Sequence, residues 1–274
     1  FRGRVTFTIH NVGGKPIGFG ARILKKDKNQ PKYINSPETP VYHKSDVLYG
    51  MFQAKQAIRN TGNCYLVEGY TDVVSLHLSG IENVVASSGT SLTEGQIKLI
   101  KRFADQVTVL YDGDPAGIKA SLRGIDLLLE GGLNVKAVVF PEGEDPDSSP
   151  QKVGSEAFAA YLEEKSRNFI GFKIDLYRDE MESDPLKKAN LIKEVVQSIS
   201  KIPDPILRSV FSKEAAGLLE IGEDILFTEL NKSLLQNQKQ EAKKITQEKK
   251  AEEAVQDLLG PERATSDIEI LRIQ

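Results

Sequence analysis

The stretch VTVLYDGDPAG, residues 107–117, joins an apolar run to two closely spaced aspartates and a proline. Val107–Tyr111 has the length and the valine content of a strand that is buried on both faces of a sheet. Pro115 is favoured in the first turn of a helix, and Asp114 before it is a good N-cap residue. The stretch therefore predicts a buried strand, an acidic turn and a helix in direct succession.

Three similar apolar runs lie on either side of this stretch: CYLVE (64–68), NVVAS (83–87) and VKAVVF (135–140). Helical patterns separate the runs. Ser91 with Glu94 predicts a capping box at the start of one helix, and Gly131 with Gly132 predicts the end of another. Because strands that alternate with helices form right-handed βαβ units, we predict an α/β domain with a parallel sheet flanked by helices.

The chain before this domain follows another pattern. Residues 5–24 alternate apolar and polar positions around Gly13 and Gly14, which predicts an antiparallel β-hairpin. Residues 25–40 contain three prolines and predict a loop, and residues 46–62 predict a helix that ends at a glycine. Residues 1–60 carry eleven Lys and Arg against three Asp and Glu, whereas the remainder is acidic. A basic part joined to an acidic part suggests phosphate binding beside metal binding, although charge also fluctuates along any chain.

The chain after this domain is helical in pattern. Residues 154–237 predict a small helical bundle with breaks at Asp-Pro, Pro-Asp-Pro and Ile-Gly-Glu. Residues 236–254 are nearly all polar and fit a linker or a solvated helix. The expected fold is thus α/β plus α, in four parts: a basic, partial antiparallel β subdomain (1–62), the parallel-sheet domain (63–153), a helical subdomain (154–235), and a linker with the start of a missing C-terminal module (236–274).

The composition excludes two classes of protein. Cys64 is the only cysteine, which excludes an internal disulfide and a multi-cysteine zinc site. No apolar stretch reaches the roughly 18 residues that a membrane-spanning helix requires. We therefore expect no zinc, no membrane partner and a cytoplasmic location. Because the chain starts at Phe1 rather than Met, we also expect it to be a fragment.

Carboxylates follow three of the predicted strands: Glu68 and Asp72, then Asp112 and Asp114, then Asp145 and Asp147 beside Glu142 and Glu144. The carboxyl ends of parallel strands meet at one edge of a sheet, where ligands bind, so these groups are expected to gather there. Crowded carboxylates stay ionised only beside a cation, and oxygen ligands suit Mg²⁺ or Mn²⁺. The sequence therefore predicts a site for roughly one to three such ions. Taken singly, Asp114 also fits a helix cap and Asp72 a first-turn helix charge.

These motifs resemble a known fold. EGYTDV (68–73), YDGDPAG (111–117) and GEDPD (143–147) resemble the Toprim fold, which bacterial replicative primases, topoisomerases and some nucleases share. PKYINSPETPVYHK (31–44) and VVASSGTSLT (84–93) are similar to the catalytic core of bacterial DNA primases. The resemblance implies a DNA-directed RNA polymerase, a nucleotidyltransferase that makes short RNA primers on single-stranded DNA from ribonucleoside triphosphates during replication. It also implies a replicative helicase partner, which we expect to bind a C-terminal module absent from this chain.

Carried over position by position, the resemblance assigns roles to particular residues. Catalysis is assigned to Glu68, Asp112 and Asp114, and metal binding to the same three with Asp145 and Asp147. Asp72, Gly69 and Gly113 support them, the glycines by allowing tight turns beside the ligand. Nucleotide and DNA binding is assigned to five positions of the N-terminal subdomain: Arg2, Arg4, Lys32, Asn35 and Lys44.

Two other functions fit the same residues. A Toprim nuclease or topoisomerase would use these acids on DNA phosphodiesters, and a topoisomerase would also need a nucleophilic tyrosine. Tyr70 lies near the acids, but a tyrosine at that position is more typical of a packing residue. A non-catalytic replisome docking module, in which residues 154–237 bind a helicase or polymerase, would need no metal at the acids.

Overall fold

The computed structural model describes residues 1–25, 29–89, 91–111, 115–141, 144–149 and 154–259, with the side chains of α4 described from Leu122 onward. The chain separates into two compact units, Phe1–Glu220 and Ile221–Gln274. The first unit holds two β-sheets and most of the helices, and the second holds the long helix α10 (Glu223–Leu259). None of the described helices is long and apolar enough to cross a membrane.

The N-terminal sheet is antiparallel, in the order β1 (Arg4–His10), β2 (Pro16–Ile23) and β3 (Tyr33–Asn35). The predicted hairpin is confirmed, and its turn is closed by the N–H of Asn11, which donates to the Lys15 carbonyl at 2.9 Å. The prediction of a loop over residues 25–40 is wrong at β3, which pairs with β2. A strand of three residues is too short to show an alternating pattern.

The second sheet contains five strands in the order β5-β4-β6-β7-β8: β4 (Asn63–Val67), β5 (Val84–Ala86), β6 (Gln106–Tyr111), β7 (Asn134–Val139) and β8 (Arg167–Asn168). The first four pair in parallel, as predicted, and β8 pairs antiparallel with β7 at the edge. The prediction of helix throughout 154–237 is wrong at β8. Asn168 interrupts the helical pattern because its side chain caps the next helix, accepting the N–H of Gly171 at 2.9 Å.

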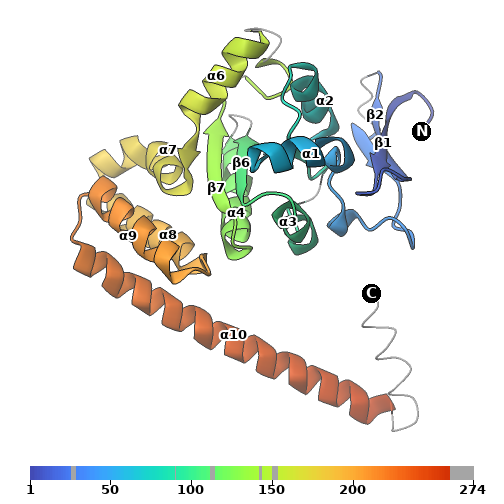
Figure 1. The fold of residues 1–274 in the computed structure, drawn as a ribbon. Coiled ribbons are helices and arrows are strands. Elements are labelled where there is room, and N and C mark those ends of the chain that lie inside the picture. Colours follow the sequence, from blue (N-terminus) through green and yellow to red (C-terminus); the bar gives the residue numbers. More distant parts are fainter. Residues whose placement is uncertain (26–28, 90, 112–114, 142–143, 150–153, 260–274) are drawn as a thin grey trace. The chain divides into compact units, whose positions relative to one another are not determined.

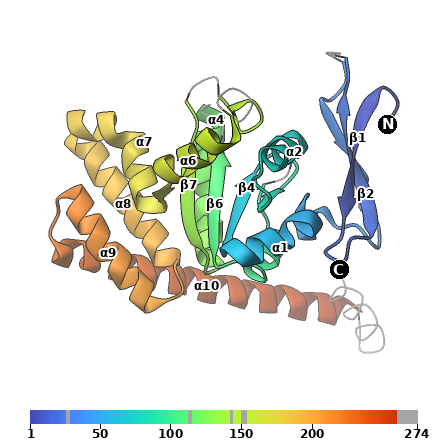
Figure 2. The same cartoon turned by 45° about the horizontal axis from the view of Figure 1, so that its top comes forward.

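Helices cover the second sheet: α1 (Met51–Thr61), α2 (Tyr70–Leu78), α3 (Glu94–Lys101), α4 (Pro115–Glu130) and α6 (Ser155–Lys165). Helices α1 and α2 lie between the two sheets in both views (Figures 1 and 2). One core cluster joins Leu76 of α2 and Phe158 of α6 to Val67, Leu110 and Val138 of the sheet. Helix α2 joins β4 to β5, and α4 joins β6 to β7, so the two connections run in opposite directions across the sheet. Because such connections are right-handed, the two helices lie on opposite faces of the sheet.

The start of α3 differs from the prediction. Thr93, not Ser91, is the N-cap and accepts the N–H of Gln96 at 3.2 Å, while Gln96 accepts the N–H of Thr93 at 3.3 Å. The prediction of a capping box at Ser91 and Glu94 is therefore wrong, because the box lies two residues later in the chain. Gln96 is fully buried and donates to the carbonyls of Lys44 and Val47, next to the short 3₁₀ helix η1 (Lys44–Asp46). These long-range contacts decide where the helix begins.

The helical region of the first unit continues with α7 (Phe169–Ser183), α8 (Pro185–Lys201) and α9 (Pro205–Leu219). The predicted Asp-Pro breaks are confirmed, because Asp184 and Asp204 cap α8 and α9 and a proline follows each. Of the two possibilities for residues 236–254, the helix is found, since α10 runs through this segment.

Candidate active site

A cleft of about 1330 Å³ lies where the strands of the second sheet end and the N-terminal sheet faces them. Residues that follow β4, β5 and β7 form one wall, and Arg22, Lys32 and Lys44 of the N-terminal region belong to the other. The sequence predicts a site at the carboxyl ends of the parallel strands. This edge of the second sheet forms one wall of the cleft, and the N-terminal region forms the other.

The acidic wall holds four of the predicted carboxylates: Glu68, Asp72, Asp145 and Asp147. Glu68 directly follows β4, Asp72 lies in the first turn of α2, and the other two lie in the loop after β7. The structure thus brings together acids that are far apart in the sequence. Asp112, Gly113 and Asp114 lie outside the described residues, between the last residue of β6 and Pro115.

Hydrogen bonds hold these carboxylates in place. Asp72 Oδ2 accepts the N–H of Gly69 at 2.8 Å, which fixes the first turn of α2. Asp145 Oδ1 accepts the N–H of Ser148 at 2.6 Å, and Asp147 accepts a hydrogen bond from the hydroxyl of Ser75 in α2. The loop after β7 is therefore tied to the helix that follows β4.

Gly69 does not supply the backbone freedom predicted for it. Its φ of −122° and ψ of 168° are extended values that any residue adopts. A Cβ at this position would lie 3.2 Å from Asp72 Oδ2, tighter than an ordinary contact. Close approach of Asp72 to the backbone, rather than a turn, accounts for a small residue here.

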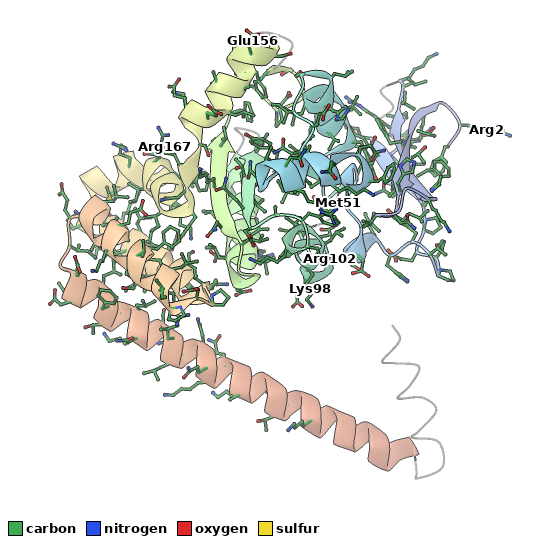
Figure 3. All side chains as sticks on the ribbon, viewed as in Figure 1. Arg2, Met51, Lys98, Arg102, Glu156 and Arg167 are labelled. Carbon is green, nitrogen blue, oxygen red and sulfur yellow. The ribbon has the colours of Figure 1, made fainter. Side chains whose placement is uncertain are left out.

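The basic wall contains three of the five residues predicted to bind nucleotide or DNA: Lys32, Asn35 and Lys44. Arg2 and Arg4 do not line the cleft. Arg4 Nη1 donates to the carbonyl of Lys32 at 3.3 Å, and Arg2 extends from the far edge of the hairpin (Figure 3). The predicted set therefore divides into a group in the cleft and a group outside it.

Comparison with known proteins identifies the family. The DNA primase catalytic core, N-terminal domain, matches residues 1–55, and a Toprim-like family matches residues 65–149. A DNA primase of Clostridium acetobutylicum is 42% identical over 241 residues, which are 85% of this chain and 39% of that protein. The crystal structure of a DNA primase domain from Pseudomonas aeruginosa is 34% identical with a TM-score of 0.74, covering 84% of this chain and 73% of that one. The chain belongs to the DNA primase family.

Further comparisons show how much of the related primases this chain covers. The structure of a primase catalytic domain bound to single-stranded DNA is 37% identical with a TM-score of 0.69, covering 79% of this chain and 70% of that one. The chain spans 39% of the Clostridium primase and 38% of the primase of Halalkalibacterium halodurans, well under half of each. A family described as the DnaB-helicase binding domain of primase matches residues 172–224. This segment lies inside the chain, whereas the resemblance to primases implied a helicase-binding module beyond it.

Two arginines that line the cleft are not predicted from the sequence: Arg22 of β2 and Arg123 of α4. Arg22 pairs in register with Tyr33 of β3, and its guanidinium lies 5.7 Å from the centre of the Tyr33 ring. The place of Arg22 in the cleft cannot be predicted from the sequence, because the strand with which it pairs, β3, is not predicted either. Arg123 lies four residues before Leu127, which also lines the cleft. Residues four apart lie on the same face of a helix. This spacing is the one sequence pattern that places Arg123 and Leu127 together on a face of α4.

The tyrosines beside the acids of the cleft are not exposed nucleophiles. Tyr111, the last residue of β6, is buried, and burial together with the Glu68 carboxylate raises the pKa of its hydroxyl. Tyr70 is 2% exposed, and burial likewise raises the pKa of its hydroxyl. Both hydroxyls therefore stay protonated in the folded protein.

The acidic wall fits a divalent cation by its chemistry, because carboxylate oxygens are the ligands that Mg²⁺ and Mn²⁺ prefer. Among the residues that the structure describes, no group of three His, Cys, Asp or Glu side chains is placed to hold an ion. The predicted ligands Asp112 and Asp114 are not among those residues. The complete metal-ligand set therefore stays a prediction.

Proposed function

We propose that this chain is the polymerising core of a DNA primase, a metal-dependent nucleotidyltransferase that joins ribonucleotides into short RNA primers on single-stranded DNA. One observation carries the proposal: acidic and basic walls face each other across one cleft in a member of the primase family. A metal-bound triphosphate carries both signs of charge and matches such a cleft on both sides.

The basic wall would hold the substrate. Arg22, Lys32 and Lys44 would contact the phosphates of the ribonucleoside triphosphate, and Asn35 would contribute a neutral hydrogen-bonding group. Arg2 and Arg4 lie outside the cleft and would contact the template backbone instead. Since such contacts release counterions, template binding would weaken steeply as salt increases.

The acidic wall would hold Mg²⁺ or Mn²⁺ through Glu68, Asp112, Asp114 and Asp145, with Asp147 and Asp72 in supporting positions. When bound, the ion supplies charge neutralisation for the triphosphate and acidifies a coordinated hydroxyl. Glu68, which directly follows β4, would serve either as a ligand or as the acceptor of the attacking hydroxyl's proton. Gly113 would leave room for the backbone beside the ligand.

The helical region would contact the replicative helicase. Residues 172–224 match a helicase-binding family, and the α9 side chains of Ile206 and Val210 are 72% and 55% exposed. Apolar side chains one turn apart on an exposed helix are suited to a protein partner.

The proposal places the chain at the chromosome, in the cytoplasm. It keeps the division into parts at 1–62, 63–153, 154–235 and 236–274, which limited proteolysis would test.

Calorimetric titration tests the proposal. Mn²⁺, and then Mn²⁺ with a ribonucleoside triphosphate, would be titrated into the chain, into Glu68→Gln and into Asp112→Asn/Asp114→Asn. Glu156→Gln, an exposed acid of α6, is the control (Figure 3). We expect metal-dependent triphosphate binding in the chain and in the control, and its loss in the other two. Metal-dependent cleavage of DNA without triphosphate binding would favour the nuclease instead.

A further inference from the structure

Tyr70 connects the two walls of the cleft. It is the first residue of α2 and follows Glu68 by two positions, yet its ring packs against the N-terminal sheet. The ring stacks on Phe7 at a centroid distance of 5.0 Å and meets Tyr49 edge to face at 4.8 Å. A Cβ at Gly20 would lie 2.3 Å from Tyr70 Cζ, so only glycine allows this close approach. The tyrosine therefore fixes α2 against strand β2.

The hydroxyl of Tyr70 reaches into the basic wall. An ammonium group only donates hydrogen bonds, so we assign the Asn35 amide with its oxygen toward Lys44 Nζ, at 3.2 Å. The amide nitrogen of Asn35 then donates to the Tyr70 hydroxyl at 2.6 Å and to the carbonyl of Ile34 at 3.2 Å. A continuous path of hydrogen bonds thus runs from Tyr70 through Asn35 to the Lys44 ammonium.

Packing and hydrogen bonding hold the Tyr70 hydroxyl in place, because its ring is fixed between Phe7 and Tyr49 and its oxygen is bonded to Asn35. Asn35 and Lys44 both line the cleft, so the hydroxyl is connected to two polar groups of the basic wall.

We propose that the Tyr70 hydroxyl is a positioning group that sets Asn35 and Lys44 at the distance from the carboxylates that a metal-bound polyphosphate requires. The residue touches neither substrate nor metal in this role. Its effect on the triphosphate rests on the proposed function, whereas its effect on the position of Lys44 does not.

Tyr49 provides a matched control. It belongs to the same aromatic cluster and packs directly on Tyr70. Among the residues that the structure describes, the hydrogen bonds of Asn35 go to Tyr70, Ile34 and Lys44 and none involves the Tyr49 hydroxyl. Tyr49→Phe therefore removes a hydroxyl from the cluster without touching the path to Lys44.

The test compares Tyr70→Phe with Tyr49→Phe in three measurements: the melting temperature, the dissociation constants of Mn²⁺ and of Mn²⁺ with ATP, and the rate at which an amine reagent modifies Lys44. In Tyr70→Phe we expect unchanged Mn²⁺ binding, faster modification of Lys44 and about tenfold weaker ATP binding, the effect of one lost hydrogen bond near a charge. Tyr49→Phe should match the parent chain in all three.

The outcomes separate the two proposals. Unchanged Lys44 modification and unchanged ATP binding in Tyr70→Phe would overturn the positioning role. A fall in melting temperature with equal loss of Mn²⁺ and ATP binding would also overturn it, because a packing role alone predicts that result. If the parent chain binds no ATP, the proposed function fails. Faster modification of Lys44 in Tyr70→Phe alone would still support the positioning of Lys44.

A double-mutant cycle sharpens the assignment. If Tyr70 acts through Asn35, then Tyr70→Phe should add little to the loss of ATP binding that Asn35→Ala causes. Additive losses in the double variant would show that the hydroxyl acts by another route and would contradict the proposal.

Discussion

Lysines meet carboxylates in two regions of this molecule, and the two regions differ in how the charges are paired. Where α4, α7 and α8 meet, Lys173 is buried and donates to Ser198 at 2.7 Å, and Ser198 donates to Asp126 at 2.5 Å. Lys201 lies 3.7 Å from the same aspartate and 2.8 Å from Glu130. The charges in this region are matched to one another.

The lysines of the cleft have other surroundings. Lys32 and Lys44 line the cleft together with Glu68 and Asp145, which come from the other sheet. We expect these two lysines to bind a ligand, whereas the lysines beside Asp126 form ion pairs within the fold. Because removing one partner of a buried ion pair destabilises a fold, the two groups of lysines should respond differently to substitution.

The largest expected effect is on the structural side. Lys173→Ala should lower the free energy of unfolding by about 3 kcal/mol, because it removes the buried donor to Ser198 and one of the two ammonium groups beside Asp126. Urea denaturation measures this change. Lys98→Ala, at an exposed ion pair of α3 that points outward in Figure 3, is the control and should change stability by less than about 1 kcal/mol. Equal losses in the two variants would remove the distinction between the regions.

The next largest effect is expected on ligand binding in the cleft. Lys44→Ala should leave the free energy of unfolding within about 1 kcal/mol of the parent value and weaken binding of Mn²⁺ with ATP by more than about tenfold. Calorimetry and denaturation of the same samples give both values. A large loss of stability with unchanged ATP binding would assign Lys44 to the structural class instead.

A smaller effect is expected for Arg123 on α4, since it lies on the cleft but opposite the main basic wall. Arg123→Ala should weaken binding of Mn²⁺ with ATP by roughly threefold, a fraction of a charge-assisted hydrogen bond. The control is Arg102→Ala, just after α3, which removes a guanidinium that lies over the Phe103 ring and should have no effect on binding. Identical binding in all three proteins would exclude Arg123 from the site.

The smallest effect concerns pH. Burial lowers the pKa of Lys173 below its ordinary value of 10.5, and Asp126 only partly opposes this. Just below pH 10.5 the unfolded chain therefore binds more protons than the folded chain, so the free energy of unfolding rises as pH increases toward that value. Raised tyrosine pKa values act in the opposite sense, so the measured quantity is the difference between the parent chain and Lys173→Met. A difference that stays constant with pH would contradict the assignment.

The sequence by itself determined the strands, most helices and the order of the acids. Buried parallel strands carry continuous apolar runs, and the residues that follow each run occupy the same edge of the sheet, so Glu68, Asp72, Asp145 and Asp147 could be placed in one site before any coordinates. The short strands β3 and β8 gave no such signal, because two or three residues show no period.

Only the tertiary structure decided the basic wall. Lys32 and Lys44 could be named from motifs, but the positions of Arg22 and Arg123 in the cleft depend on strand pairing and on the face that α4 presents. The same holds for Tyr70, whose sequence pattern indicates packing and whose hydroxyl function appears only when β3 lies beside α2. A helix or strand can be predicted from the spacing of apolar residues, caps and prolines within one short stretch. A cleft between two sheets depends on contacts between residues that are distant in the chain.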